Sequence, residues 1–367
     1  MRIHYLINGL NGGGAAFPLI DVIGLMRAAG HEVRLSALMP QDLRALPRLN
    51  AAGIECDVLG RGPRDYVRSA QALLRRLRAD RPDLLWTSLT RATLYGQVAG
   101  RMLDIPVVSW QHNAFLKPGN RALLRRTKRL TRRWVADSES VARFACAELG
   151  IARERIDIWS LFVARADQAV AQAWNGIGPF RIGSLGRLHP NKQYEILIRA
   201  LARIRELDAA LYAHLEVVVA GSGDEQGALE ALAAELHVER IRFVGFVEAT
   251  ADFLAGLHAY VQPSRNEGLC IAAHEAMLAA LPVVTTPVGE LQFSVLDGTT
   301  GYLRGIGDID GFAQALIALV RDPAGAHVMG QAARARVLAR FGHAQFEASG
   351  RALLQRLERE LRAANSE

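Results

Sequence analysis

The sequence contains little cysteine, and its three cysteines, Cys56, Cys146 and Cys270, stand far apart. Their spacing matches no metal-binding pattern, and an odd, scattered set predicts reduced thiols rather than a disulfide framework. No stretch approaches the run of ~18 apolar residues that a membrane-spanning helix needs. The amino-terminal MRIHYLING predicts a first strand rather than a cleavable signal. These absences favour a cytoplasmic protein.

Lysine is equally rare, with only Lys117, Lys128 and Lys192 beside 41 arginines. None of the three follows a glycine, which excludes the Gly-Lys-Ser/Thr phosphate loop of NTPases. The net charge of +7 is unevenly distributed, because residues 1–175 contain 26 Lys and Arg against 15 Asp and Glu, whereas residues 176–367 contain 18 against 22. The first half is therefore expected to face nucleic acid, a membrane surface or another anionic ligand.

Short apolar runs alternate with segments of helical periodicity along all 367 residues, about twice the length of one domain. Such alternation predicts parallel sheets covered by helices on both faces. The predicted strands are Ile3–Ile7, Val33–Leu38, Leu84–Thr87, Val107–Trp110, Val135–Asp137, Ile156–Ser160, Phe180–Leu185, Leu215–Ala220, Ile241–Val244, Ala259–Gln262 and Val283–Thr286.

The alternation pauses between Phe162 and Gly178, where Asn-Gly and Gly-Pro pairs indicate a linker. We therefore predict an α/β protein of two doubly wound, Rossmann-like domains that face a central cleft. Residues 1–168 would form the first domain and residues 176–340 the second. Residues 341–367 predict a helix that could pack on either domain, the N-terminal domain included. Because ligands of such sheets bind beyond the carboxyl ends of the strands, the cleft is the expected site.

Three glycines, Gly12 to Gly14, follow the first predicted strand. Glycines at this place let backbone N–H groups approach an anion at the start of a helix. A dinucleotide-binding loop would need a glycine where Phe17 stands and an acidic residue at the end of the second strand, and the sequence has neither. NAD is therefore not expected, and a plain tight turn is the alternative.

Two cations follow the first strand of the second half. Gly186 and Arg187 close that strand, and Lys192 stands five residues later at the start of a predicted helix. A guanidinium and an ammonium at such a turn suit a diphosphate, since the first forks two oxygens and the second acts as a point charge. A solvated pair in a loop is the alternative.

Glu267 and Glu275 follow the strand Ala259–Gln262, the first in a loop and the second in a predicted helix. Carboxylates accept hydrogen bonds from sugar hydroxyls, and the free amides near Cys270 and Ile271 can donate to the same ligand. Two glutamates eight residues apart are, however, common by chance.

His112 follows the strand Val107–Trp110, which places it at the expected ligand edge unless it only caps the strand. No histidine stands four residues after His274, so that His274-Glu275 is not a zinc-protease motif. No metal site is expected.

Taken in order, these segments resemble the retaining nucleotide-sugar glycosyltransferases of family 4 (group 1), which have the GT-B fold of two Rossmann-like domains. The resemblance spans nearly the whole chain and is strongest over Phe180–Leu303. Its parts are Gly12-Gly13-Gly14, Gly30-His31-Glu32-Val33, His112, Asp137-Ser138-Glu139-Ser140, Gly186-Arg187 with Lys192, Val219-Ala220-Gly221-Ser222-Gly223, Phe243-Val244-Gly245-Phe246, Glu267 to Glu275, and Leu281-Pro282-Val283-Val284 with Gly289.

The resemblance implies a role for each matching position. Arg187 and Lys192 would neutralise the donor diphosphate in place of a metal, so that no metal or other cofactor is needed. Glu275 would hold the ribose hydroxyls, and His112 would contact the sugar near the reacting carbon. The catalytic set implied is His112, Arg187, Lys192 and Glu267. The further donor contacts implied are Gly13, Gly14, Gly221, Phe246, Val247, Cys270 and Ile271.

The same resemblance implies a hexosyltransferase. It would move a sugar from a UDP- or GDP-linked donor to a saccharide or lipid-linked saccharide acceptor in surface polysaccharide or glycolipid biosynthesis. The chain departs from the family at Leu269 and Cys270, where an aromatic residue and a glycine are usual, and at Leu281 and Glu290. An epimerase of the same fold and a non-enzymatic basic protein are the alternatives. A phosphorylase would need a pyridoxal-bearing lysine, and Lys192 is already assigned.

The segment Lys117–Arg133 contains eight basic residues and no acid. Its apolar residues recur on one face of a predicted helix that ends in Trp134, and such a helix suits an anionic lipid surface. We therefore expect peripheral attachment to the inner face of the cell membrane, helped by a second basic helix over Arg64–Arg81. A solvated face over a core stripe is the alternative, and nucleic acid is disfavoured because no aromatic residues interleave. The basic residues concerned are Arg121, Arg125, Arg126, Lys128, Arg129, Arg132 and Arg133.

Overall fold

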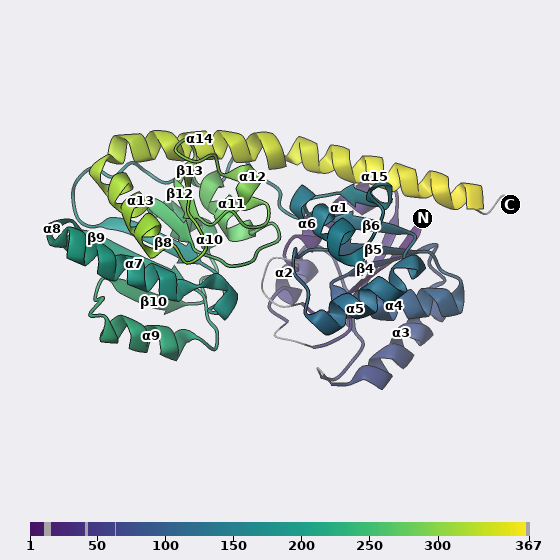
Figure 1. The fold of residues 1–367 in the computed structure, drawn as a ribbon. Coiled ribbons are helices and arrows are strands. Elements are labelled where there is room, and N and C mark those ends of the chain that lie inside the picture. The colour runs from purple at the N-terminus through teal and green to yellow at the C-terminus, as the bar shows by residue number, and fades with distance from the viewer. Residues whose placement is uncertain (11–15, 41–42, 63, 365–367) are drawn as a thin grey trace. The chain divides into compact units, whose positions relative to one another are not determined.

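The computed structural model describes residues 1–10, 16–40, 43–62 and 64–364. It divides the chain into unit 1, which comprises Met1–Val163 and His343–Glu367, and unit 2, which comprises Ala164–Gly342 (Figure 1). The residues between the two predicted domains, 169–175, belong to unit 2. Gly12 to Gly14, and with them the predicted donor contacts Gly13 and Gly14, lie outside the described residues.

Unit 1 contains a parallel sheet of seven strands in the order β3-β2-β1-β4-β5-β6-β7. The strands are β1 (Arg2–Ile7), β2 (Glu32–Ala37), β3 (Cys56–Val58), β4 (Leu84–Ser88), β5 (Val107–Gln111), β6 (Arg133–Ala136) and β7 (Ile156–Ile158). The helices of this unit are α1 (Leu19–Ala28), α2 (Leu46–Ala51), α3 (Tyr66–Asp80), α4 (Thr90–Leu103), α5 (Pro118–Thr127), α6 (Glu139–Phe144) and α15 (His343–Ala364). The sequence does not predict β3, since three half-exposed residues give no periodicity.

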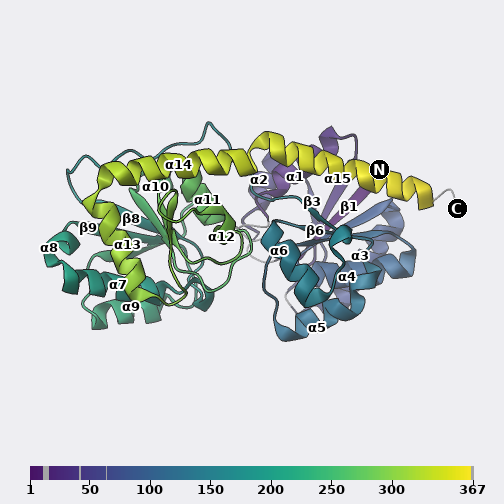
Figure 2. The same cartoon turned by 45° about the horizontal axis from the view of Figure 1, so that its top comes forward.

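Unit 2 contains a second parallel sheet, in the order β10-β9-β8-β11-β12-β13. Figure 2 labels β8 and β9 of this sheet. Its strands are β8 (Phe180–Leu185), β9 (Leu215–Ala220), β10 (Ile241–Gly245), β11 (Ala259–Gln262), β12 (Val283–Thr285) and β13 (Gly301–Leu303). Its helices are α7 (Tyr194–Leu207), α8 (Ala209–Ala213), α9 (Gln226–Glu235), α10 (Thr250–Ala255), α11 (Ile271–Leu278), α12 (Leu291–Ser294), α13 (Ile309–Arg321) and α14 (Pro323–Phe341). In both sheets the strand order reverses next to the first strand, which confirms the prediction of two doubly wound, Rossmann-like domains.

Aromatic packing joins the C-terminal helix α15 to the core of unit 1. The ring centroids of Trp110 and Trp159 are 4.9 Å apart, and those of Trp159 and Phe346 are 5.3 Å apart. The indole N–H of Trp159 also donates to the carbonyl oxygen of Phe346 at 3.1 Å. Leu353 and Leu357, further along α15, are fully buried in the same cluster. The last helix is thus part of the core of unit 1.

The basic segment is not one amphipathic helix, and the prediction of a helix tipped by a tryptophan is wrong. Helix α5 ends at Thr127, a 3₁₀ turn covers Lys128–Leu130, and Arg133 and Trp134 belong to strand β6. Trp134 is almost fully buried in a hydrophobic cluster. The aromatic and β-branched residues of Arg133–Ala136 fit a strand with two covered faces, and this overrides the helical spacing.

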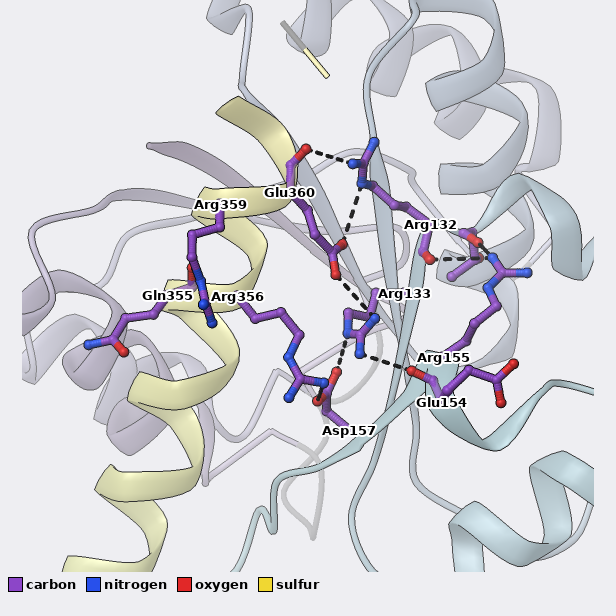
Figure 3. A network of polar contacts seen from close by, with 10 residues as sticks. Arg132, Arg133, Glu154, Arg155, Asp157, Gln355, Arg356, Arg359 and Glu360 are labelled. Carbon is purple, nitrogen blue, oxygen red and sulfur yellow. Dashed lines mark hydrogen bonds and ion pairs between the residues drawn. The ribbon is translucent and has the colours of Figure 1, made fainter. Parts of the chain in front are cut away.

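Four of the seven predicted membrane-facing cations are instead bound within unit 1. Arg121 forms an ion pair with Glu148 at 2.6 Å, and the ammonium of Lys128 donates to the carbonyl oxygen of Leu149 at 3.0 Å. The other two, Arg132 and Arg133, contact helix α15, as Figure 3 shows. Arg132 donates to the carbonyl oxygen of Glu360 at 2.7 Å, and Arg133 pairs with Asp157 and with the Glu360 carboxylate, the latter at 3.2 Å.

Candidate functional site

The predicted cations and carboxylates of unit 2 lie at one edge of its sheet. Strands β8 and β11 are parallel neighbours, so that their carboxyl ends meet there. Gly186 and Arg187 follow β8, and the loop with Glu267 follows β11. This is the edge at which doubly wound sheets bind their ligands.

Lys192 and Glu267 form an ion pair, with 2.8 Å between the ammonium nitrogen and Oε1. The hydroxyl of Ser264 donates to the same oxygen at 2.6 Å, and Gln262 in turn donates to Ser264 at 2.8 Å. Burial is the largest single influence and opposes the charge of Lys192, but the Glu267 carboxylate, together with Cys270 and Tyr194, raises the pKa of the ammonium overall. The site therefore contains a permanent positive charge. Its position is held through Glu267 and Ser264 by Gln262, the last residue of strand β11.

Two glycines bring further predicted residues to this pair. A β-carbon on Gly186 would lie 3.2 Å from Cε of Lys192, so the lysine side chain lies against the residue that precedes Arg187. Gly221 has a φ of +140°, and a β-carbon on it would come within 1.9 Å of the carbonyl oxygen of Gly186. Only glycine fits there. Because Lys192 also lies against Gly186, this contact brings Gly221 close to the lysine side chain.

Arg187 is exposed, and no described residue accepts a hydrogen bond from its guanidinium or forms an ion pair with it. The structure thus places an unengaged guanidinium one residue from Gly186, against which Lys192 lies. A guanidinium and an ammonium so placed can bind two neighbouring phosphate groups.

Two of the implied donor contacts, Phe246 and Val247, follow strand β10. The backbone N–H of Gly221 donates to the carbonyl oxygen of Gly245 at 2.6 Å, and Phe246 and Val247 come directly after that glycine. Phe246 is 47% exposed. Both residues therefore belong to the same edge of the sheet as the cations.

Cys270 is the residue before helix α11, and it adopts a left-handed conformation with a φ of +61°. Its side chain is buried, and burial together with the nearby Glu267 carboxylate raises the pKa of the thiol. The amides of Cys270 and Ile271 donate to no acceptor in the described part of the chain. They are free for an acceptor of a ligand, as the sequence predicts.

Glu275 lies one turn into helix α11. Burial raises the pKa of its carboxyl group to about 7. No hydrogen bond or ion pair to this group comes from the residues that the structure describes. Since burying a carboxylate without donors is costly, the site gains from a ligand that offers hydroxyl groups.

His274, which sequence reasoning only excluded as a zinc ligand, supports the start of this helix. It is fully buried, with Nδ1 3.0 Å from the carbonyl oxygen of Cys270 and Nε2 2.7 Å from the hydroxyl of Ser294. Burial lowers its pKa to about 4, so the ring is neutral near pH 7. Its place inside the Glu267–Glu275 segment was the only signal for this role.

His112 belongs to unit 1, where three consecutive strand ends meet. Its Nδ1 lies 2.9 Å and 3.0 Å from the two carboxylate oxygens of Asp137, and its Nε2 lies 2.6 Å from the hydroxyl of Ser88. All three side chains are buried. The sequence resemblance includes Asp137 but assigns it no role, and it does not include Ser88.

Within the described ranges, no group of three or more His, Cys, Asp and Glu side chains could hold a metal ion. None of the helices in those ranges is long and apolar enough to cross a membrane.

Two family models match the chain. Residues 12–166 match the model described as Glycosyltransferase Family 4, and residues 179–322 match the model described as Glycosyl transferases group 1. The D-inositol 3-phosphate glycosyltransferase of Kribbella flavida is 34% identical over 183 residues, which are 46% of this chain and 42% of that protein. The lipopolysaccharide core biosynthesis glycosyltransferase LpsE of Rhizobium meliloti is 35% identical over 140 residues, 38% of this chain and 39% of that protein. The chain thus matches about two fifths of the length of these relatives.

Solved structures share the fold over nearly the whole chain. HepE of Anabaena in complex with UDP-glucose has a TM-score of 0.83 at 20% identity, with 97% of this chain and 99% of that chain covered. Sucrose-phosphate synthase of Thermosynechococcus elongatus has a TM-score of 0.77 at 19% identity, with 99% of both chains covered. At such identities the likeness shows the GT-B fold alone.

Proposed function

The chain belongs to the group 1 glycosyltransferases of family 4, with the GT-B fold, and on that premise we propose that it is a retaining, metal-independent hexosyltransferase. Its donor is a UDP- or GDP-linked sugar. Its acceptor is a saccharide, carried on a lipid, in surface polysaccharide or glycolipid biosynthesis. The UDP-glucose bound by HepE and the role of LpsE in lipopolysaccharide core biosynthesis support this choice of donor and acceptor.

The ion pair between Lys192 and Glu267 carries the proposal, together with the unengaged guanidinium of Arg187. These residues follow the neighbouring carboxyl ends of strands β8 and β11. The donor diphosphate binds Arg187 and Lys192, which together offset its negative charge. As the bond from the sugar to the phosphate breaks, charge grows on the diphosphate, and fixed cations stabilise that charge most in the transition state. This is the task that a metal performs in other transferases.

Most of the remaining donor contacts come from residues at the same edge of the sheet of unit 2. The ribose hydroxyls donate to Glu275, which satisfies its carboxylate, and the sugar hydroxyls donate to Glu267. The amides of Cys270 and Ile271 bind sugar oxygens, and the base lies against Phe246 and Val247. His112 contacts the sugar near the reacting carbon, where an oxocarbenium-like centre develops. Gly13 and Gly14, which lie outside the described residues, stay donor contacts implied by the sequence resemblance alone.

A screen of thermal stability against nucleoside diphosphates in the presence of EDTA tests the proposal. UDP or GDP should raise the unfolding temperature without added metal, because a ligand that binds only the folded state stabilises it. Arg187→Ala should lose most of this shift, whereas Arg199→Ala, an exposed arginine on α7, should keep it. A shift that requires a divalent metal, or no shift with any nucleotide, would contradict the proposal. Conversion of the nucleotide sugar without an acceptor would favour the epimerase.

We also propose that the protein works in the cytoplasm at the inner face of the membrane. Arg125, Arg126 and Arg129 are exposed, and no described carboxylate pairs with them. Leu123, within the basic segment, is 47% exposed, and Phe115, two residues before that segment, is 46% exposed, so apolar and basic groups occur together. Sedimentation with anionic and neutral liposomes tests this, with the Arg125, Arg126 and Arg129 triple alanine variant as comparison. Equal recovery of wild type in both supernatants would refute membrane attachment.

A further inference from the structure

Three buried side chains of unit 1 form a continuous series of hydrogen bonds through His112. As described above, Nδ1 of His112 lies between the two carboxylate oxygens of Asp137, and Nε2 lies 2.6 Å from the hydroxyl of Ser88. Strands β4, β5 and β6 are consecutive neighbours in the sheet. Ser88 is the last residue of β4, and His112 and Asp137 directly follow β5 and β6. The series therefore lies at the carboxyl edge of the sheet, where doubly wound folds bind their ligands.

The hydrogen bonds hold the His112 ring in one arrangement. A carboxylate only accepts hydrogen bonds, so Nδ1 carries the proton that it donates to Asp137. In the neutral ring Nε2 is then an acceptor, and the hydroxyl of Ser88 donates to it. The indole of Trp110 lies beside the ring, with the two centroids 5.5 Å apart. Both ring nitrogens are thus engaged within unit 1.

The charge of the Asp137 carboxylate is not offset by a cation. The side chain is buried, and among the residues that the structure describes only His112 bonds to its carboxylate. Burying a carboxylate is costly unless it is paired or fully hydrogen-bonded, and one imidazole N–H compensates only part of that cost. Such a position favours positive charge that arises nearby.

A second histidine–aspartate pair in the same unit shows what a compensated arrangement looks like. Nδ1 of His4 lies 3.2 Å from the carboxylate of Asp80, and Nε2 lies 3.0 Å from the hydroxyl of Ser36. Asp80, however, also forms ion pairs with Arg34 and Arg76. It ends helix α3, which leads into the amino end of β4, so this pair lies away from the carboxyl edge. The same three residue types therefore occur once with the charge neutralised and once without.

We propose that Asp137 is a positioning residue for sugar transfer that acts through His112. It holds the ring with the proton on Nδ1, and its charge polarises that ring. The inference rests on the proposed function, in which His112 contacts the sugar near the reacting carbon. That carbon gains positive charge in the oxocarbenium-like transition state, and a fixed negative charge close to it lowers the energy of that state. The sugar is uncharged before the reaction, so Asp137 contributes to turnover and not to donor binding.

The test compares Asp137→Asn with Asp80→Asn in the full chain. Asparagine keeps the size of the side chain and removes the charge, and both variants alter a buried histidine–aspartate pair of the same unit. Steady-state kinetics with the donor found in the nucleotide screen give kcat and KM. The unfolding temperature with and without UDP or GDP reports folding and donor binding. Nitrogen NMR spectra of isotope-labelled histidine show which nitrogen of His112 carries the proton, and His112→Gln assigns the resonances.

We expect Asp137→Asn to lower kcat by about tenfold or more, with KM within about threefold of wild type and an unchanged thermal shift. Asp80→Asn should unfold at a lower temperature, because it loses two ion pairs, and keep kcat within about twofold. The proton of His112 should lie on Nδ1 in wild type, and Asp137→Asn should weaken that preference.

Equal kcat in the two variants, an effect of Asp137→Asn on KM alone, or a wild-type ring with its proton on Nε2 would overturn the proposal. The wild-type spectra need no variant, so they test the hold on the ring even where Asp137→Asn does not fold. Failure of wild type to transfer sugar from any nucleotide donor would instead count against the proposed function, and the spectra would still decide whether Asp137 fixes His112.

Discussion

Lys192 and Glu267 neutralise each other in the ligand-free chain, yet both are assigned to the donor. The 2.8 Å ion pair keeps the ammonium charged despite its burial, and the lysine side chain stays against Gly186. A ligand phosphate therefore meets a cation that is already in place. Such preorganisation is what stabilises a developing charge without reorganisation at the moment of reaction.

Lys192→Ala should lower the turnover of sugar transfer by ~10²-fold or more, since it removes one of two cations that stabilise the leaving diphosphate. Steady-state kinetics with the donor found in the nucleotide screen would measure it. Arg199→Ala is the matched control for the loss of one positive charge in unit 2. Full turnover in Lys192→Ala would show that the site assignment is wrong.

Glu275 predicts a pH effect on stability. Its ordinary pKa of 4.5 is raised to about 7 by burial, so the folded chain favours the protonated carboxyl group. That contribution is fully present below pH ~4.5 and is lost as the pH rises through about 7. Glu275→Gln stays neutral and should be more stable than wild type by about 2–3 kcal/mol at pH 8, with no difference at pH 4.5.

Urea denaturation at the two pH values would measure this difference, with the exposed Glu235→Gln as control. If the difference in stability between Glu275→Gln and wild type is the same at both pH values, burial does not keep Glu275 protonated. Nucleotide affinity of Glu275→Ala should fall at the same time, because the ribose hydroxyls lose their acceptor.

At the scale of elements, the turn after β9 depends on close backbone packing. Gly221→Ala should destabilise the protein by about 2–4 kcal/mol, because its β-carbon would lie 1.9 Å from the Gly186 carbonyl oxygen. Gly227→Ala, in helix α9 with nothing within 4 Å of an added β-carbon, should instead stabilise it by up to about 1 kcal/mol. Thermal unfolding of both variants would check the opposite signs, and a tolerated Gly221→Ala would contradict the packing.

Helix α15 is attached to strands β6 and β7 by a cluster of charged groups (Figure 3). Arg133 binds Asp157 and Glu360, and Arg356 of α15 donates to Asp157 at 2.9 Å. Arg133→Met should cost about 1–2 kcal/mol, since Asp157 and Glu360 lose their shared partner but keep Arg356 and Arg132. The exposed Arg129→Met should change stability by less than about 0.5 kcal/mol. Similar denaturant midpoints for the two variants would refute the attachment.

At the scale of the whole molecule, unit 1 is made from both ends of the chain. Deletion of residues 343–367 removes Phe346, Leu353 and Leu357 from its core, and we expect unit 1 to lose cooperative unfolding as a result. Unit 2 has its own hydrophobic cluster, so residues 164–342 expressed alone should fold and keep the thermal shift with UDP or GDP. Calorimetry of both fragments would measure this, and an unfolded 164–342 fragment would contradict the division.

Sequence patterns alone determined the two doubly wound sheets and the motifs at their strand ends. The alternation of apolar runs and helical periodicity is local, and the order of motifs along the chain identifies the family. The same local patterns misassigned Arg132, Arg133 and Trp134, because a basic amphipathic spacing does not distinguish a lipid surface from a strand packed against α15.

Only the tertiary structure decided which side chains meet. Lys192 and Glu267 are 75 residues apart and Arg133 and Glu360 are 227 apart, so neither pair produces a periodic signal. Whether a cation is free for a ligand, as at Arg187, or held by a carboxylate, as at Arg121, depends on the neighbours that the sheet order and helix packing supply. Composition shows that the charges exist, and packing decides what each one binds.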